Sequence, residues 1–197
     1  MIVSKTNIKE VVESLMKESF LGIDCETSGL DYQDRLFSFA IAGANNTHYF
    51  NFNVEADIPE EYQLDFKEAR VIIGPLFART DVTWFIHNAS FDLDMLERSG
   101  FILNGELHCT MTIAKLQNNS HPTYTLDAVS QRAGFPGKDD RVMEYLNKHK
   151  LYEKGPNKRK RYFFNKVPFD LIVEYTILDV ELSRRLGLSQ LGNGGTT

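Results

Sequence analysis

Two carboxylates two residues apart, Asp24 and Glu26, are the first residues in the chain whose types and spacing could do chemistry. A β-strand places alternate side chains on one face, so both carboxylates would point the same way. Neighbouring carboxylates raise each other's pKa unless a positive charge compensates them, and a divalent cation with oxygen ligands is the usual compensation. On an exposed strand the pair would be solvated charge only. The apolar flank at 20–23 and Leu30 favour burial, and therefore a metal site.

Two later carboxylates also have unusual settings. Asp92 shares the apolar stripe of a predicted helix with Met95 and Leu96 at helical spacing, where a carboxylate needs a partner or a metal. The alternative is a helix-start carboxylate stabilised by the helix dipole. Asp179 follows Tyr175 by four residues in the last predicted helix, which places a phenol and a carboxylate side by side at the rim of the core.

The segment from Lys154 to Lys166 contains six Lys or Arg and no Asp or Glu, and Tyr162, Phe163 and Phe164 are interleaved with them. Such a segment could contact phosphates or stack on bases, although a solvated loop is the alternative. Because the whole chain carries a net charge of −5, any contact with nucleic acid must use a local basic patch of this kind.

The 197 residues are enough for one domain with a full core, and 42% of them are hydrophobic. Cys25 and Cys109 offer neither a disulfide framework nor metal-ligand spacing, and both are expected to be small core residues. Residues 1–19 are charged and do not resemble a signal peptide, and no apolar run approaches the ~20 residues of a membrane span. We therefore expect a cytoplasmic protein without membrane contact.

The pattern of apolar residues predicts a mixed α/β protein. Three early strands with short connections favour an antiparallel meander, and the helix and strand that follow favour a crossover onto the same sheet. Asn7 and Glu10 have the spacing of a capping box at the start of the first helix. The expected strands are 20–27, 37–42, 47–52, 82–87 and 106–111, and the expected helices are 7–18, 64–77, one starting near 89, 111–117, 125–133, 139–150 and one starting at Pro168. Residues 1–187 are read as one domain, and 188–197 as a flexible Gly-rich tail.

Three short motifs resemble those of a known enzyme superfamily. They are Asp24-x-Glu26-Thr27-x-x-Leu30, Asn88-x-x-x-Phe91-Asp92 and Tyr175-x-x-x-Asp179. They are similar to the three exonuclease motifs of the DEDD superfamily, and the tyrosine marks the DEDDy branch. The surrounding segments 85–93 and 167–170 resemble the proofreading 3′→5′ exonuclease domain of family A DNA polymerases of bacterial or bacteriophage type.

The resemblance implies a ribonuclease H-like fold, a mixed sheet of about five strands flanked by helices, with three antiparallel strands followed by parallel ones. It also implies hydrolysis of DNA from single-stranded or frayed 3′ ends with two divalent cations, Mg²⁺ or Mn²⁺, spaced about 3.5–4 Å apart. Asp24 would bridge both cations, Glu26 and Asp179 would hold the one that activates water, and Asp92 would act on the other. Tyr175 would orient the attacking water.

The resemblance further assigns substrate contacts. Leu30 would wedge against the terminal bases, Thr27 and Phe91 would line the pocket, and Asn88 would contact the nucleotide. The basic residues expected to assist nucleic-acid binding are Lys158, Arg159, Lys160 and Arg161.

Two other functions remain open from the sequence. A ribonuclease D-type RNA exonuclease shares the same motifs, and no residue here is a clear reader of the 2′-hydroxyl group. A non-catalytic nucleic-acid-binding relic of the fold is the other, against which the intact acidic set argues. In the family a polymerase domain would follow this segment, so a polymerase domain is a candidate partner.

Overall fold

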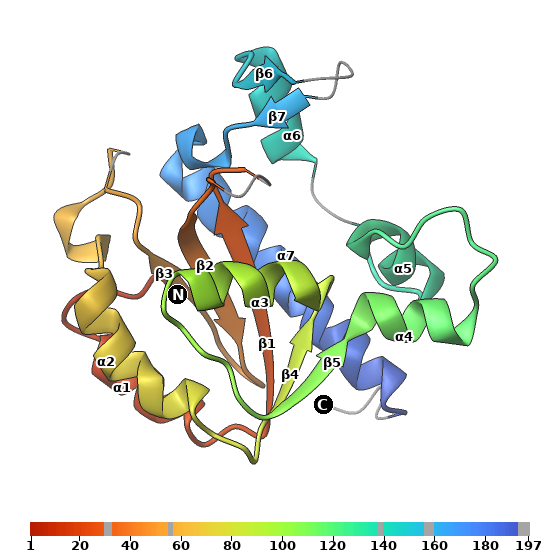
Figure 1. The fold of residues 1–197 in the computed structure, drawn as a ribbon, viewed down its shortest axis with the longest axis horizontal. Helices are drawn as coiled ribbons and strands as arrows, with labels where there is room; N and C mark the ends of the chain where they lie inside the picture. The colour runs from red at the N-terminus through yellow and green to blue at the C-terminus, as the bar shows by residue number, and fades with distance from the viewer. Residues whose placement is uncertain (30–32, 55–56, 138–139, 156–159, 193–197) are drawn as a thin grey trace.

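The structure, a computed structural model, describes residues 1–197 except 30–32, 55–56, 138–139, 156–159 and 193–197. Its centre is a five-stranded sheet with the strand order β3-β2-β1-β4-β5 (Figure 1). A separate two-stranded hairpin, β6–β7, lies beyond the carboxyl end of β1. The strands are β1 Phe20–Thr27, β2 Leu36–Ala42, β3 Thr47–Asn51, β4 Thr83–Ile86, β5 Glu106–Cys109, β6 Tyr152–Lys154 and β7 Lys160–Tyr162.

The predicted arrangement of the central sheet is confirmed. β1, β2 and β3 pair antiparallel, with a Gly43–Asn46 turn between the last two, whereas β4 pairs parallel with β1 and β5 parallel with β4. The parallel pairs require crossovers, which α2 and α3 provide. The helices are α1 Ile8–Leu15, α2 Phe66–Phe77, α3 Ala89–Arg98, α4 Thr110–Gln117, α5 Leu126–Arg132, α6 Arg141–Lys148 and α7 Phe169–Gln190, with 3₁₀ helices η1 Glu60–Tyr62 and η3 Phe164–Lys166.

The alternation of side chains along β1 divides the core into two layers. Leu21, Ile23 and Cys25 pack with residues of α1, α2 and α3 in the largest apolar cluster. The other face of the sheet is covered by α7, whose Val173 and Val180 pack on residues of β2 and β3. Figure 1 shows α3 and α7 on opposite sides of the sheet, so residues from both helices can reach the end of β1.

Two local predictions were wrong. Asn7 precedes α1, but its side chain accepts a hydrogen bond from Ser4 N at 2.8 Å instead of capping the helix. The last helix continues through Gln190, whose side chain binds His108 and the carbonyl of Thr110, so the expected tail does not begin at 188. The basic segment, for which a solvated loop was the alternative, contains β7 and η3, and β7 pairs with β6. No helix in the described part of the chain is long and apolar enough to cross a membrane.

Candidate active site

Asp24 and Glu26 lie on the face of β1 that α7 covers. On this face Gly22 is so close to α7 that a Cβ atom there would lie 2.9 Å from Cβ of Arg184 and 3.0 Å from the carbonyl oxygen of Val180. The close approach of α7 to β1 therefore depends on a glycine at this position. Since side chains alternate along a strand, Gly22, Asp24 and Glu26 all point toward α7.

α7 brings Asp179 to the same face. Thr176 Oγ1 donates to Glu26 Oε1 at 3.2 Å, and Val180 lies against Gly22. Asp179 therefore lies between the two contact residues Thr176 and Val180 along α7. Asp24 likewise lies between their partners, Glu26 and Gly22, along β1. Asp179 is 3% exposed and Glu26 is 7% exposed, so both carboxylates are taken out of water.

Tyr175 is buried on α7 beside Thr176. Its ring packs in an apolar cluster with residues of α6 and with Val167, which fixes the ring independently of the hydroxyl group. The phenol is thus held on the helix that carries Asp179, one helical turn away.

Asp92 approaches β1 from the other side, from the first turn of α3. β4 pairs with β1 only along Phe20 to Gly22, and beyond that point the side chain of Asp92 accepts the N–H of Cys25 at 3.0 Å. Burial raises the pKa of the Asp92 carboxyl to about 7, although its hydrogen bonds with Cys25 act in the opposite direction. A carboxyl group with such a pKa favours a neutralising partner, either a proton or a cation.

Several of the carboxylates lie close enough to the buried thiol of Cys25 to affect its pKa. Burial raises its pKa first, and the charges of Asp92, Asp24 and Glu26 raise it further. Three acidic groups from β1 and α3 therefore act on one buried atom, and the contact of Thr176 with Glu26 adds the helix of Asp179 to the cluster.

This donor set fits divalent cations in its chemistry, because it consists of carboxylate oxygens, the ligands that Mg²⁺ and Mn²⁺ prefer. Across the described ranges, however, no three His, Cys, Asp or Glu side chains are grouped closely enough to hold one ion as they stand. Glu26 accepts from Thr176 through Oε1, and Asp92 accepts from Cys25 N through Oδ1, so each carboxylate is held through one of its two oxygens.

The predicted substrate contacts surround this cluster in part. Asn88 is exposed and directly precedes α3, with a left-handed backbone at φ 64° and ψ 47°, and Phe91 is half-buried one turn later. Thr27 is buried, and its hydroxyl donates to the carbonyl of Gly29 at 2.6 Å. Leu30 lies outside the described residues.

The basic segment has partners within the protein. Lys158 and Arg159 lie outside the described residues. Lys160 Nζ donates to Asn147 Oδ1 at 2.7 Å and lies 4.1 Å from the centre of the Tyr152 ring. Arg161 pairs with Glu153 at 2.7 Å and with Asp34. Both described residues are thus ordered by neighbours in or near the hairpin.

Sequence reasoning missed two residues at this end of β1. Thr176 falls at the apolar spacing of α7, and its hydroxyl group, one position after Tyr175, is a signal for a possible partner of a carboxylate. Asp34 is 2% exposed, and nothing in its neighbourhood in the sequence indicates burial, because its partner Arg161 is far away along the chain.

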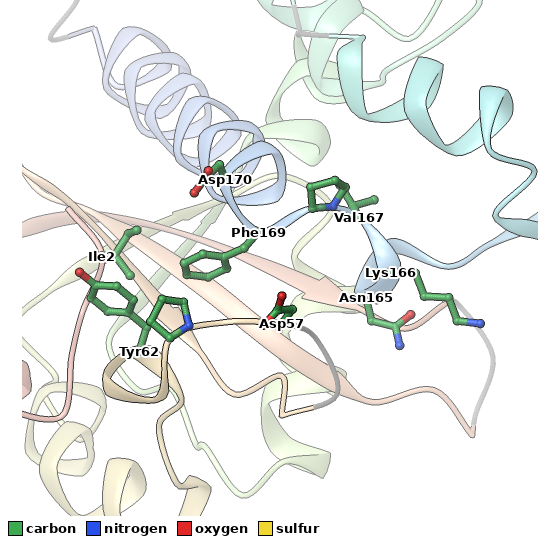
Figure 2. A pocket seen from close by; sticks show the side chains of 10 residues that line it. Ile2, Asp57, Tyr62, Asn165, Lys166, Val167, Phe169 and Asp170 are labelled. Carbon is green, nitrogen blue, oxygen red and sulfur yellow. The ribbon is translucent and has the colours of Figure 1, made fainter.

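A surface pocket in the described part of the chain lies elsewhere. It has a volume of about 890 Å³ and is formed by the start of α7, η1 and η3 (Figure 2). Tyr62 and Phe169 stack at its wall with ring centres 6.1 Å apart, and Asp57 and Lys166 are among its polar residues. None of the four acidic residues or Tyr175 lines it, so this pocket does not coincide with the candidate active site.

Comparison with protein families agrees with the motif analysis. Residues 1–189 match the 3′-5′ exonuclease family of DNA polymerase A type, and the chain therefore belongs to this family. Among curated protein sequences there is no match.

Similar solved structures share the fold. The complex of Trypanosoma brucei RNase D with RNA U12 has a TM-score of 0.70 and 15% identity, over 97% of this chain and 61% of that chain. Brucella melitensis NrnC with bound Mg²⁺ has a TM-score of 0.59 and 17% identity, over 90% of this chain and 74% of that chain. The Pol1 structure from M. smegmatis with DNA primer-template and dNTP has a TM-score of 0.61 and 14% identity, over 98% of this chain and 28% of that chain. The architecture is therefore the ribonuclease H-like fold of nucleases, as predicted.

Proposed function

We propose that this protein hydrolyses DNA from the 3′ end, one nucleotide at a time, with two divalent cations, Mg²⁺ or Mn²⁺. The observation that carries the proposal is the match to the 3′-5′ exonuclease family over residues 1–189. The gathering of acidic groups at the end of β1 supports it, because that family match covers the strand and both helices from which these groups come.

Asp24, Glu26 and Asp179 would hold the cations from the α7 side of β1, and Asp92 would do so from α3. The cations would supply stabilisation of the attacking and leaving oxygens in an in-line displacement. Tyr175 carries a phenolic hydroxyl group that can donate and accept hydrogen bonds, so it would orient the attacking water. Thr176 would keep the Glu26 carboxylate on the side of α7.

The substrate would lie over the carboxyl end of β1. Thr27, Leu30 and Phe91 would contact the terminal nucleotide, and the exposed Asn88 would contact it from the start of α3. Lys158, Arg159 and Lys160 would attract the phosphates of the preceding nucleotides. Arg161 belongs to the same basic segment.

DNA rather than RNA is proposed because the family is that of DNA polymerase A. A proofreading role in DNA replication, with a polymerase domain as partner, follows from the same family. The similarity of the fold to that of RNase D supports the RNA alternative. A reducing, cytoplasmic setting is proposed from the two cysteines, both of which are free.

Product analysis on 5′-labelled single strands tests the proposal. DNA and RNA of one sequence are incubated with Mg²⁺ or Mn²⁺, and the expected result is stepwise shortening of the DNA from its 3′ end that EDTA abolishes. The variant Asp24→Asn with Glu26→Gln is the control for a contaminating nuclease and should be inactive. Internal cuts or activity in EDTA would contradict the mechanism, and faster shortening of RNA would establish the ribonuclease alternative.

A further inference from the structure

The β6–β7 hairpin is joined to the turn after β1 by a charged cluster of Asp34, Arg161 and Glu153, in which Asp34 is buried. The side chain of Asp34 is 1% exposed and that of Arg161 is 23% exposed. Arg161 donates through Nη2 to Asp34 Oδ1 and through Nη1 to Glu153 Oε1, the latter at 2.7 Å. A buried carboxylate is stable only when it is paired, so Asp34 depends on this guanidinium group.

Asp34 in turn organises the residues that directly follow β1. Ser28 Oγ donates to Asp34 Oδ1 at 2.9 Å, and Ser28 N donates to the carbonyl of Arg35 at 3.0 Å. A Cβ atom on Gly29 would collide with the Asp34 carboxylate and lie 3.0 Å from Arg161 Nε, so only glycine fits beside the ion pair. Ser28 is two residues beyond Glu26, and the cluster therefore fixes the chain at the edge of the candidate active site.

The charge of Arg161 is compensated within the protein. Its Nη1 and Nη2 are directed to Glu153 and Asp34, whose combined charge outweighs that of one guanidinium group. Glu153 and Arg161 are also directly opposite each other in the hairpin, so the same arginine ties β6, β7 and the β1 turn together.

We propose that Arg161 and Asp34 are positioning residues that hold the basic hairpin beside the carboxyl end of β1, where a single strand would pass on its way to the carboxylates. The proposal rests on the proposed exonuclease function. Arg161 acts through Asp34 and does not contact the substrate. Since the hairpin would meet nucleotides that precede the 3′ terminus, loss of the ion pair affects long strands more than a dinucleotide.

A double-mutant cycle with Asp34→Asn, Arg161→Gln and both changes together tests the pairing. We expect each single variant to raise KM for a long single-stranded DNA about five- to tenfold, and the double variant to be no worse than either single one, because both changes remove the same interaction. The value of kcat/KM for a dinucleotide should change much less. Asp34→Asn leaves Arg161 paired with Glu153, whereas Arg161→Gln leaves the buried Asp34 carboxylate without its guanidinium partner. Asp34→Asn therefore keeps the length comparison available if Arg161→Gln does not fold.

If Arg161 contacted DNA directly, KM would change in the opposite direction in one of the variants. Asp34→Asn would then release Arg161 for the substrate and lower KM, whereas Arg161→Gln alone would raise it. Either that result or additive effects would overturn the proposal. Arg79→Gln is the matched control, because it removes the same charge, an ion pair of 2.9 Å with Asp81 and a hydrogen bond of 2.7 Å to the carbonyl of Glu18. These contacts precede β4, at the opposite end of the sheet, so KM for both substrates should be that of the parent protein.

Hydrogen exchange separates this proposal from the proposed function. Amides of β6 and β7 should exchange faster in both single variants than in the parent protein, whether or not the protein degrades DNA. Unchanged exchange would overturn the positioning role. Absence of exonuclease activity in the parent protein, with faster exchange in the variants, would reject the proposed function while leaving the ion pair as the element that holds the hairpin.

Discussion

The residues of the candidate active site differ in how they are held, and this difference separates their roles. Asp179 is a buried carboxylate on α7, one turn from Tyr175, whose ring is fixed by apolar packing. Removal of the carboxylate changes the charge of the site, whereas removal of the phenolic oxygen changes one hydrogen-bonding group and leaves the packing in place. The two residues can therefore be distinguished although they share one helix.

We expect Asp179→Ala to cost on the order of 4 kcal/mol or more in transition-state stabilisation, about 10³-fold in rate, and to weaken metal binding. Tyr175→Phe should cost ~1–3 kcal/mol, roughly 10- to 100-fold, and leave metal binding like that of the parent. Single-turnover rates and metal titration measure both. Loss of metal binding in Tyr175→Phe, or near-normal activity in Asp179→Ala, would show that the roles are assigned wrongly.

Asn88 combines a special backbone conformation with an exposed side chain. At φ 64° a glycine is accommodated without strain, whereas an alanine is disfavoured by about 1–2 kcal/mol. Asn88→Ala should therefore lower the free energy of unfolding more than Asn88→Gly does, as urea denaturation would measure. If the amide group contacts the nucleotide, both variants should raise KM by a similar factor; an effect in Asn88→Ala alone would mean that only the backbone matters.

At the scale of elements, β1 is the support to which the site is attached. α7 approaches one face at Gly22, α3 reaches the free edge at Cys25, and the hairpin is tied to the turn at Asp34. Each of these contacts joins segments that are distant in the chain. The hairpin carries the most basic residues, whereas the candidate metal-binding carboxylates lie on β1, α3 and α7. Its charge can therefore be changed without altering the carboxylates.

Neutralising Lys158, Arg159 and Lys160 to Gln should weaken DNA binding and flatten its dependence on salt, because each phosphate contact releases counterions. For single strands, we expect the slope of log Kd against log salt to fall by up to about 0.7 for each lost phosphate contact. The single-turnover rate at saturating DNA should change little. A large fall in that rate with unchanged binding would place the hairpin in the catalytic machinery.

At the scale of the whole molecule, the buried acidic cluster makes stability depend on pH and on divalent cations. The pKa of Asp92 is raised to about 7, whereas an unfolded aspartate has a pKa near 4. Between these values the native state binds more protons than the unfolded state. The free energy of unfolding should therefore fall as pH rises from about 4 to about 7 in EDTA, with a slope of at most about 1.4 kcal/mol per pH unit from this one group.

Urea denaturation in EDTA over this pH range measures the effect. Asp92→Asn is the control, since it removes the titrating group, and the difference between the two pH profiles isolates Asp92. Mg²⁺ should stabilise the parent protein most at the high end of the range, by about 2.7 kcal/mol when its concentration is a hundred times its Kd. A parent profile no steeper than that of Asp92→Asn would contradict the raised pKa.

The order and type of most central elements follow from the sequence. Apolar periodicity defined the strands and long helices, because burial of one face imposes a period of two on a strand and of 3.6 on a helix. It also singled out Asp24, Glu26, Asp92 and Asp179, since a carboxylate in an apolar pattern requires a partner. The short elements of the basic segment were missed, because β6 and β7 depend on pairing with each other more than on a pattern of their own.

Which side chains meet one another depends on the tertiary fold. Asp92 accepts the Cys25 N–H, Thr176 binds Glu26, and Arg161 pairs with the buried Asp34, each across a long separation in the chain. Such contacts depend on how the helices pack on the sheet and on where the pairing between two strands ends. Local sequence patterns predict neither. A charged residue with a distant partner therefore resembles a solvated one in the sequence, and only the folded chain shows that its charge is compensated within the protein.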